Sequence, residues 1–188
     1  DGRVYTFRLK ESYWSTLPKA KKGETPTVWE QPVKVTAADF VFGMQRAVMP
    51  ETGSALAAQL FGIQNAQAVS EGKKAAEELG VKAVDEDTLT ITLTEADAGF
   101  PVKLAGTPFM PCNREFFEYT AGRYGLEKAY VLTNGPFSLG AWNHGQSLLL
   151  NKNEQYHEAE DVYPATVRYV IQPEAETGEA LLAGTLDA

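Results

Sequence analysis

Residues 131–156 read VLTNGPFSLGAWNHGQSLLLNKNEQY, and this stretch sets the fold expected for the second half of the chain. Apolar and polar side chains alternate over residues 137–142, which is the period-two pattern of a β-strand with two different faces. His144-Gly145 then predicts a turn, because glycine adopts positive φ without a steric penalty. Three consecutive leucines within residues 147–151 predict a second strand that is buried on both faces. The stretch therefore predicts a β-hairpin.

A sharp bend is predicted just before this hairpin, at Asn134-Gly135-Pro136. Gly135 frees the backbone, and Pro136 restricts its own φ and removes a hydrogen-bond donor. We expect Gly135 either to have a positive φ or to pack closely against neighbouring backbone, so that Gly135→Val would be strongly destabilising. None of these side chains is chemically reactive. The interpretation is a rigid corner at which one lobe of the protein passes to another.

Nearer the N-terminus, two patterns predict a strand and a helix. Residues 4–10 alternate between the two faces of a half-buried strand. Residues 36–39, TAAD, form a capping box in which the Thr36 hydroxyl can accept from the Asp39 amide, and the Asp39 carboxylate lies at the positive end of the helix dipole. Pro50 ends this helix. Its apolar positions form one stripe of Phe40, Val41, Met44, Ala47 and Val48.

The remaining predicted elements are short. Helical signals cover residues 54–61, 64–70, 73–79, 98–106, 113–124 and 177–183, and strand signals cover residues 81–84, 89–94 and 162–171. Asn113 is expected to cap the helix that it begins. Residues 11–34 form a long loop with Trp14 and Trp29 as its anchors.

Composition narrows the classes of function. The 188 residues carry a net charge of −8, which argues against nucleic-acid binding because phosphate binding requires a basic patch. The single cysteine, Cys112, excludes an intramolecular disulfide. No signal peptide, lipidation motif or apolar run long enough to cross a bilayer is visible. The chain opens within a strand and stops without a closing element, so we expect it to be part of a longer protein.

The side chains needed for catalysis are sparse. The only imidazoles are His144, in the predicted turn, and His157, among acidic residues on a predicted surface segment where a closed metal shell is not expected. Cys112 has no histidine beside it in sequence and is expected to be a buried, inert thiol. No glycine-rich loop precedes a helix as a phosphate loop would. We therefore expect no enzymatic activity, no metal site and no cofactor.

Three separated segments resemble one protein family. TNGPFSLGAW followed by LLLNKNEQYHEAEDV, at residues 133–142 and 148–162, resembles the TNGPF-x-L-x-x-W … L-x-K-N-x-x-Y signature of bacterial solute-binding proteins that serve ABC importers. The segments VTAADFVFGMQRAVMP and EGKKAAEELGVKAVDEDTLTITL, at residues 35–50 and 71–93, are similar to the oligopeptide- and dipeptide-binding branch, in the expected order. The loop over residues 11–34 departs from the family, which has a shorter connection there.

The resemblance implies both a fold and a function. It implies an α+β fragment of a two-lobed, type II periplasmic-binding-protein-like fold, with a mixed sheet and flanking helices. Residues 1–132 would be most of the accessory domain, and residues 133–188 part of the main ligand-binding lobe. The protein would capture oligopeptides outside the cytoplasm, at the cell surface as a lipoprotein or in the periplasm, and deliver them to the importer permease. It would meet the membrane only through a lipid anchor outside this fragment.

Alternatives stay open at this point. The same scaffold can bind another small solute, such as a sugar or a metal chelate. A structural or partner-binding α+β domain without a small-molecule pocket is the alternative from another class, and a hydrolase comes third. An extended peptide is recognised largely through main-chain hydrogen bonds, which needs no reactive side chain.

The expected ligand-binding residues come from two stretches. Residues 107–110 contribute Phe109 and Met110, and the corner contributes Asn134, Gly135 and Phe137. The competing interpretation is that Phe109, Met110 and Phe137 belong to the ordinary hydrophobic core. Trp142 is expected to be a packing residue.

Overall fold

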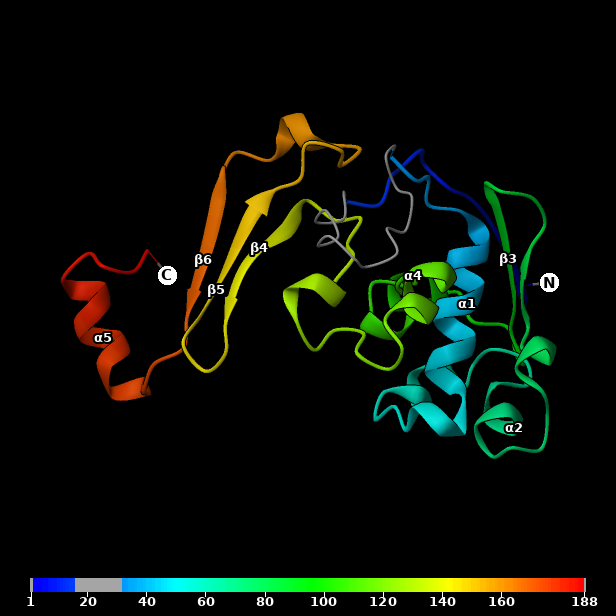
Figure 1. Ribbon diagram of the computed structural model, residues 1–188. Coiled ribbons are helices and arrows are strands. Elements are labelled where there is room, and N and C mark those ends of the chain that lie inside the picture. Colours follow the sequence, from blue (N-terminus) through cyan, green and yellow to red (C-terminus); the bar gives the residue numbers. More distant parts are fainter. Residues whose placement is uncertain (1, 16–31, 188) are drawn as a thin grey trace.

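The computed structural model describes residues 2–15 and 32–187, so most of the predicted loop over residues 11–34, with Trp29, lies outside the described residues. Figure 1 shows two bodies side by side. The first body, residues 2–15 and 32–132, contains helix α1 (Ala37–Val48) and a three-stranded sheet. The second body, residues 133–187, contains another three-stranded sheet and helix α5 (Glu174–Leu182).

The sheet of the first body follows the predicted strands. Its order is β1 (Val4–Arg8), β3 (Thr88–Thr92), β2 (Val81–Ala83), and both pairs are antiparallel. Alternation in β3 buries Leu89 and Ile91, while the threonines between them remain half-buried. The buried side chains share a core with α1, so the sheet and the helix stabilise each other by removing apolar surface from water.

Helix α1 begins where the capping box predicts it. The Asp39 carboxylate accepts from the Thr36 N–H at 2.9 Å, and the Thr36 hydroxyl donates to the same oxygen at 3.3 Å. The helix ends at Val48, before Pro50. Gly43, in the middle of α1, permits a close approach that the sequence did not reveal, because a Cβ there would lie 2.4 Å from the Met110 carbonyl oxygen.

Two apolar clusters fill the first body. The larger cluster includes Met44, Val48, Leu60, Ile63, Val69, Leu79, Ile91, Phe100 and Phe109. The smaller cluster joins Trp14, Val35, Phe116 and Leu132, which are far apart in the sequence. The short helices around these clusters are α2 (Ala66–Ser70), α3 (Phe100–Lys103) and α4 (Arg114–Tyr119), together with the 3-10 turns η1 (Pro50–Thr52), η2 (Ala57–Leu60), η3 (Ala76–Glu78), η4 (Thr107–Phe109) and η5 (Lys128–Tyr130).

The second body contains the predicted hairpin. Strands β4 (Phe137–Asn143) and β5 (Ser147–Lys152) are antiparallel and are joined by a turn in which Gly145 has a φ of +70°. Strand β6 (Thr166–Val170) pairs antiparallel with β5, after the 3-10 turn η6 (Ala159–Asp161). The register shifts between Leu139 and Ala141, so β4 bulges at Gly140.

The α+β class is confirmed, with two differences of detail. Each adjacent strand pair in the described part of the chain is antiparallel, where a mixed sheet was expected. Short connections within the β2–β3 and β4–β5 hairpins favour this arrangement, because parallel neighbours need a longer crossover. The three leucines of β5, Leu148 to Leu150, are half-buried rather than buried on both faces. No layer within the described chain covers this sheet completely, which is why they keep exposure.

The helix predicted over residues 113–124 is shorter than expected. It covers Arg114–Tyr119, with Asn113 as the N-cap accepting from the Phe116 N–H at 2.8 Å. The chain leaves the helix at Ala121, whose φ is +47°. No helix in the part of the chain that the structure describes is long and apolar enough to cross a membrane.

Candidate ligand-binding site

The corner at residues 134–136 is held by Asn153. The Asn153 side chain donates to the Gly135 carbonyl at 2.8 Å, and the Asn153 N–H donates to the Pro136 carbonyl at 2.9 Å. Asn153 is only 5% exposed. A buried amide that closes two hydrogen bonds fixes the bend against the end of β5. The signal for this residue was the asparagine of the L-x-K-N-x-x-Y motif, which residue chemistry alone did not single out.

Position 135 does not require glycine for either of the predicted reasons, a positive φ or close packing against backbone. Its φ is not in the left-handed region, and a Cβ built on it would meet no atom within 4 Å. The expectation of a positive φ or close backbone packing at this position is therefore wrong. The bend is stabilised by hydrogen bonds to its carbonyl groups, so Gly135 leaves open space on the outer side of the corner.

The corner is anchored to the first body through Thr133. The Ser15 N–H donates to the Thr133 carbonyl at 2.6 Å, and the Thr133 N–H donates to the Ser15 hydroxyl at 3.2 Å. The Thr133 hydroxyl donates to the Phe137 carbonyl at 3.1 Å. Trp14 and Leu132, next to these residues, belong to the smaller apolar cluster. The start of β4 is thus bound to a buried part of the first body.

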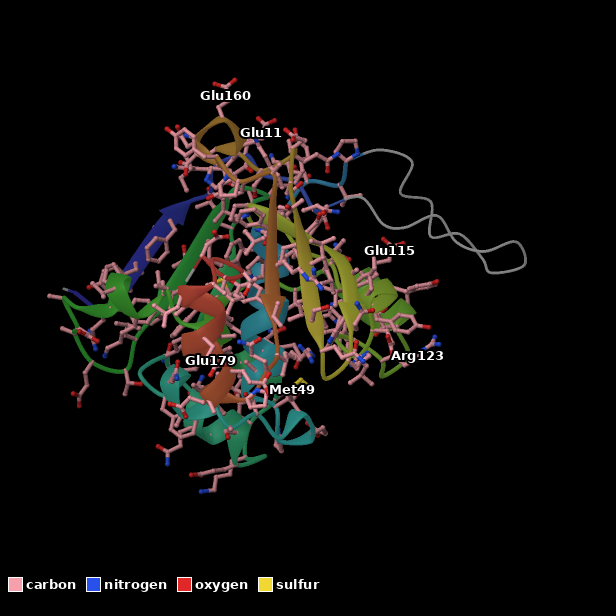
Figure 2. All side chains as sticks on the ribbon, turned by 90° about the vertical axis from the view of Figure 1, so that its left-hand side faces the viewer. Glu11, Met49, Glu115, Arg123, Glu160 and Glu179 are labelled. Atoms are coloured by element: carbon pink, nitrogen blue, oxygen red, sulfur yellow. The ribbon has the colours of Figure 1, made fainter. Side chains whose placement is uncertain are left out.

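A second connection lies at the same end of β5 as the corner, in the segment that follows Lys152. Figure 2 shows Glu11 and Glu160 at the same end of the molecule. There the Lys10 Nζ lies 2.6 Å from the Glu158 Oε1, in an exposed ion pair between the first and the second body. Exposed pairs of this kind contribute little to stability, so the buried contacts at Ser15 and Thr133 are the stronger connection.

The predicted site residues fall into two groups. Phe109 is 3% exposed and belongs to the larger core cluster, where its ring lies 6.0 Å from that of Phe100. Met110, the next residue, is 49% exposed. Asn134, Gly135 and Phe137 are half-buried at the corner. Within residues 2–15 and 32–187, no hydrogen bond joins the 109–110 segment to the corner.

Two groups that could take part in chemistry are quiet. Cys112 is buried, as predicted, and burial raises the pKa of its thiol. His157 Nε2 lies 3.5 Å from the Glu158 Oε1 on the surface. No group of three or more potential metal ligands gathers within residues 2–15 and 32–187.

Asp39 is a buried carboxylate of the first body, and its pKa is raised. It is 8% exposed and accepts hydrogen bonds from the Trp14 indole at 3.3 Å and from the Asn113 amide at 3.4 Å, besides those from Thr36. Burial raises the pKa of this carboxyl, and the hydrogen bonds from Thr36 and Trp14 oppose the shift. Its role is structural, because it joins α1 to the segment at residue 14 and to the start of α4.

The second body exposes much of its apolar surface. Tyr163 and Leu182 are 91% and 92% exposed, and Tyr169 and Ile171 are more than half exposed. Beyond Leu132, the only described side chains that are buried are Ser147 and Asn153, and both are polar. A sheet with an uncovered apolar face suits a wall of a larger binding structure.

Comparison with known proteins identifies the family. Residues 1–188 match the family described as bacterial extracellular solute-binding proteins, family 5 Middle. The chain belongs to this family. It is 30% identical over 162 residues to the oligopeptide-binding protein OppA of Bacillus subtilis, a match that covers 86% of this chain and 27% of that protein. A match of 33% identity over 152 residues, 80% of this chain and 28% of the relative, is to the probable deoxycholate-binding periplasmic protein YgiS of Escherichia coli.

A solved structure has the same fold. The substrate-binding domain of an oligopeptide ABC transporter from Bacillus anthracis superposes with a TM-score of 0.88 at 35% identity, covering 100% of this chain and 34% of that one. This superposition confirms the arrangement of helices and antiparallel sheets over the full length of the chain. The chain spans about a third or less of the length of these family 5 relatives.

Proposed function

We propose that this chain is part of the substrate-capture component of an ABC importer, which binds oligopeptides outside the cytoplasm and delivers them to the permease. The observation that carries the proposal is the family 5 match over the full chain, together with the similarity to two proteins named for oligopeptides. The protein acts at the cell surface as a lipoprotein or in the periplasm. It has no catalytic role in this proposal.

The division of labour within the chain follows the two bodies. Residues 1–132 form most of the accessory domain, and residues 133–188 form part of the ligand-binding lobe. The distribution of buried side chains supports this division, because the first body has its own apolar core and the second body has none. Exposed side chains of β6 and α5 then form surface that the remainder of the protein covers.

Peptide contact is proposed for the corner and for the exposed part of the 109–110 segment. Phe137 and Asn134 keep exposed surface, and Gly135 leaves open space in which a peptide backbone can approach. Met110 provides an adaptable apolar contact, and Phe109 supports it from the core. A rigid bend with open backbone suits recognition of the main chain of a peptide rather than of one side chain.

The test uses the full-length protein and titration calorimetry with a mixed peptide library. Phe137→Ala is expected to weaken binding by about tenfold or more, since an aromatic contact in a desolvated pocket is typically worth about 2 kcal/mol. Val102→Ala is the matched control, because Val102 is 81% exposed on the first body and lies outside the corner. Unchanged affinity in Phe137→Ala would remove the corner from the site.

The 188-residue chain alone is expected to bind peptide poorly. A small-molecule site usually covers about 70–90% of its ligand, and one wall with an accessory domain leaves much of a peptide in water. If half of a micromolar binding energy of about −8.2 kcal/mol is lost, the remaining affinity is about millimolar or weaker. Saturable heat at micromolar peptide would show that the whole site lies within these residues.

Deoxycholate is the second candidate solute, because the relative YgiS is named for it. The same calorimeter separates the two ligands in the full-length protein. Peptide binding that deoxycholate does not compete supports the first proposal. Micromolar binding of deoxycholate without binding of peptide would replace it.

A further inference from the structure

A cavity of about 360 Å³ lies in the first body, apart from the corner. It is bounded by α1, by the turn that follows α1, and by residues 107–112. Its rim carries the exposed apolar side chains Leu56 and Met110, and its lining includes Cys112 and Tyr124. Ligand pockets run from about 300 to 1,000 Å³, so this cavity fits a ligand of the size of one amino acid.

Arg46 is the only charged residue among the described residues that line the cavity. Its guanidinium carbon lies 4.5 Å from the centre of the Phe117 ring and 5.1 Å from that of Tyr124. Stacking of this kind uses the faces of the planar guanidinium. Its edge carries five N–H groups, of which one hydrogen-bonds to the neutral Cys112 thiol, so the others are available to a ligand. Within the described residues, no carboxylate lies within salt-bridge distance of Arg46.

The other polar groups around Arg46 do not neutralise it. Burial raises the pKa of the Cys112 thiol and of the Tyr124 phenol, so both are protonated and uncharged at neutral pH. Asp39 acts on Cys112 from the side of the core, but its carboxylate receives hydrogen bonds from Thr36, Trp14 and Asn113 and does not line the cavity. A half-buried cation without an anionic partner is a place where an anion gains binding energy.

We propose that this cavity, the Arg46 pocket, binds a small carboxylate with an apolar body, at a place apart from residues 134–137 that shares only Met110 with the proposed peptide contacts. The carboxylate pairs with the free edge of the Arg46 guanidinium, which matches carboxylate geometry in two parallel hydrogen bonds. The apolar body contacts Leu56 and Met110 at the rim. The carboxylate belongs either to a free acylated amino acid or to the carboxyl end of a short peptide.

The first test uses the 188-residue chain and two nearly isosteric probes, N-acetyl-leucine and N-acetyl-leucinamide, which differ in charge. Backbone amide shifts of Gly43 and Cys112 are followed by nitrogen-15 NMR during titration. N-acetyl-leucine is expected to give saturable shifts at these residues, and the amide is expected to bind at least about tenfold more weakly, because it lacks the charge-assisted hydrogen bonds. Equal binding of both probes, or no saturable shift with either, overturns the proposal.

Variants separate binding from folding. Arg46→Gln should abolish saturation by the acid, but it also removes ring contacts in the fold. Leu56→Glu is the second variant, since Leu56 is 39% exposed at the rim and a new carboxylate there repels the probe. Leu126→Glu is its matched control, because Leu126 is 59% exposed and is not part of the lining. Retained affinity in Leu56→Glu, or equal loss in both glutamate variants, contradicts the Arg46 pocket.

A third probe, N-acetyl-Ala-Ala-Leu, distinguishes the two sources of the carboxylate. It is compared with N-acetyl-leucine once that acid has given saturable shifts, and the acid that binds more tightly identifies the source. The result is independent of peptide capture at the corner, which is tested by Phe137→Ala in the full-length protein.

Discussion

The two bodies of this chain are stabilised in different ways. Every apolar side chain that is buried in the described part of the chain lies at or before Leu132. After that residue, strands form with correct pairing and a defined turn, yet their apolar side chains stay half-buried or exposed. Local pattern is therefore sufficient to specify strands, whereas burial depends on which other layer is present.

Truncation of one buried and one half-buried aliphatic residue tests this difference between the two bodies most directly. Ile91 is 0% exposed in the first body, so Ile91→Ala is expected to cost about 2–5 kcal/mol of unfolding free energy. Leu149→Ala, in the half-buried β5, is expected to cost about 1 kcal/mol in the same chain. Urea denaturation measures both. Equal losses would show that the second body has a core of its own.

Two glycines give a matched pair with the next largest effect. Gly43→Ala puts a Cβ 2.4 Å from the Met110 carbonyl oxygen, and because backbone must move, we expect a loss of about 3 kcal/mol. Gly135→Ala meets no atom within 4 Å and needs no left-handed φ, so we expect a change within about 0.5 kcal/mol. The urea denaturation midpoints of the two variants measure both losses of stability. A large loss in Gly135→Ala would restore the predicted rigid glycine corner.

The cap of α1 has a smaller effect. Thr36→Ala removes the hydroxyl that donates to Asp39 and is expected to lower stability by about 1 kcal/mol. The Thr36 N–H to Asp39 hydrogen bond remains in the variant, which limits the loss. Circular dichroism during urea denaturation gives the midpoint. An unchanged midpoint would mean that the backbone hydrogen bond alone fixes the start of the helix.

The smallest expected effect is a dependence on pH from Asp39. Burial raises the folded-state pKa of this carboxyl above its ordinary value of 3.8, so the folded chain holds the proton to a higher pH than the unfolded chain. The carboxyl therefore favours folding below its ordinary pKa, and this contribution is lost as the pH rises through the raised value. Relative to Asp39→Asn, the wild type should lose stability across that window. A constant difference between their urea midpoints would contradict the shift.

Most helices and strands were predicted from the sequence, and the predictions that failed did so for physical reasons. The capping box at Thr36 and the hairpin around Gly145 are local signals, and the structure confirms both. The predicted positive φ at Gly135 is wrong because Asn153, distant in the sequence, holds the bend through two carbonyl groups. Gly43 was missed because its need for glycine comes from the segment that ends at Met110 packing across the helix.

The candidate site shows the same limit. Phe109 and Met110 are adjacent and both apolar, and no sequence rule separates the core residue from the exposed one. The family resemblance indicated the solute-binding class from motifs, whereas the place of Arg46 in a cavity came only from the structure.

The sequence by itself determined the approximate limits of the main strands and of the first helix, because alternation, capping residues and turn residues act over a few neighbouring positions. Its motifs also resemble those of the solute-binding family, and that resemblance implied the α+β class. Only the tertiary structure decided which side chains are buried, which glycines are required and which cation lines a cavity. These properties arise where segments far apart in the chain meet, as Ser15 does with Thr133 and Gly43 with Met110, and the packing of such segments is set by the whole fold rather than by local pattern.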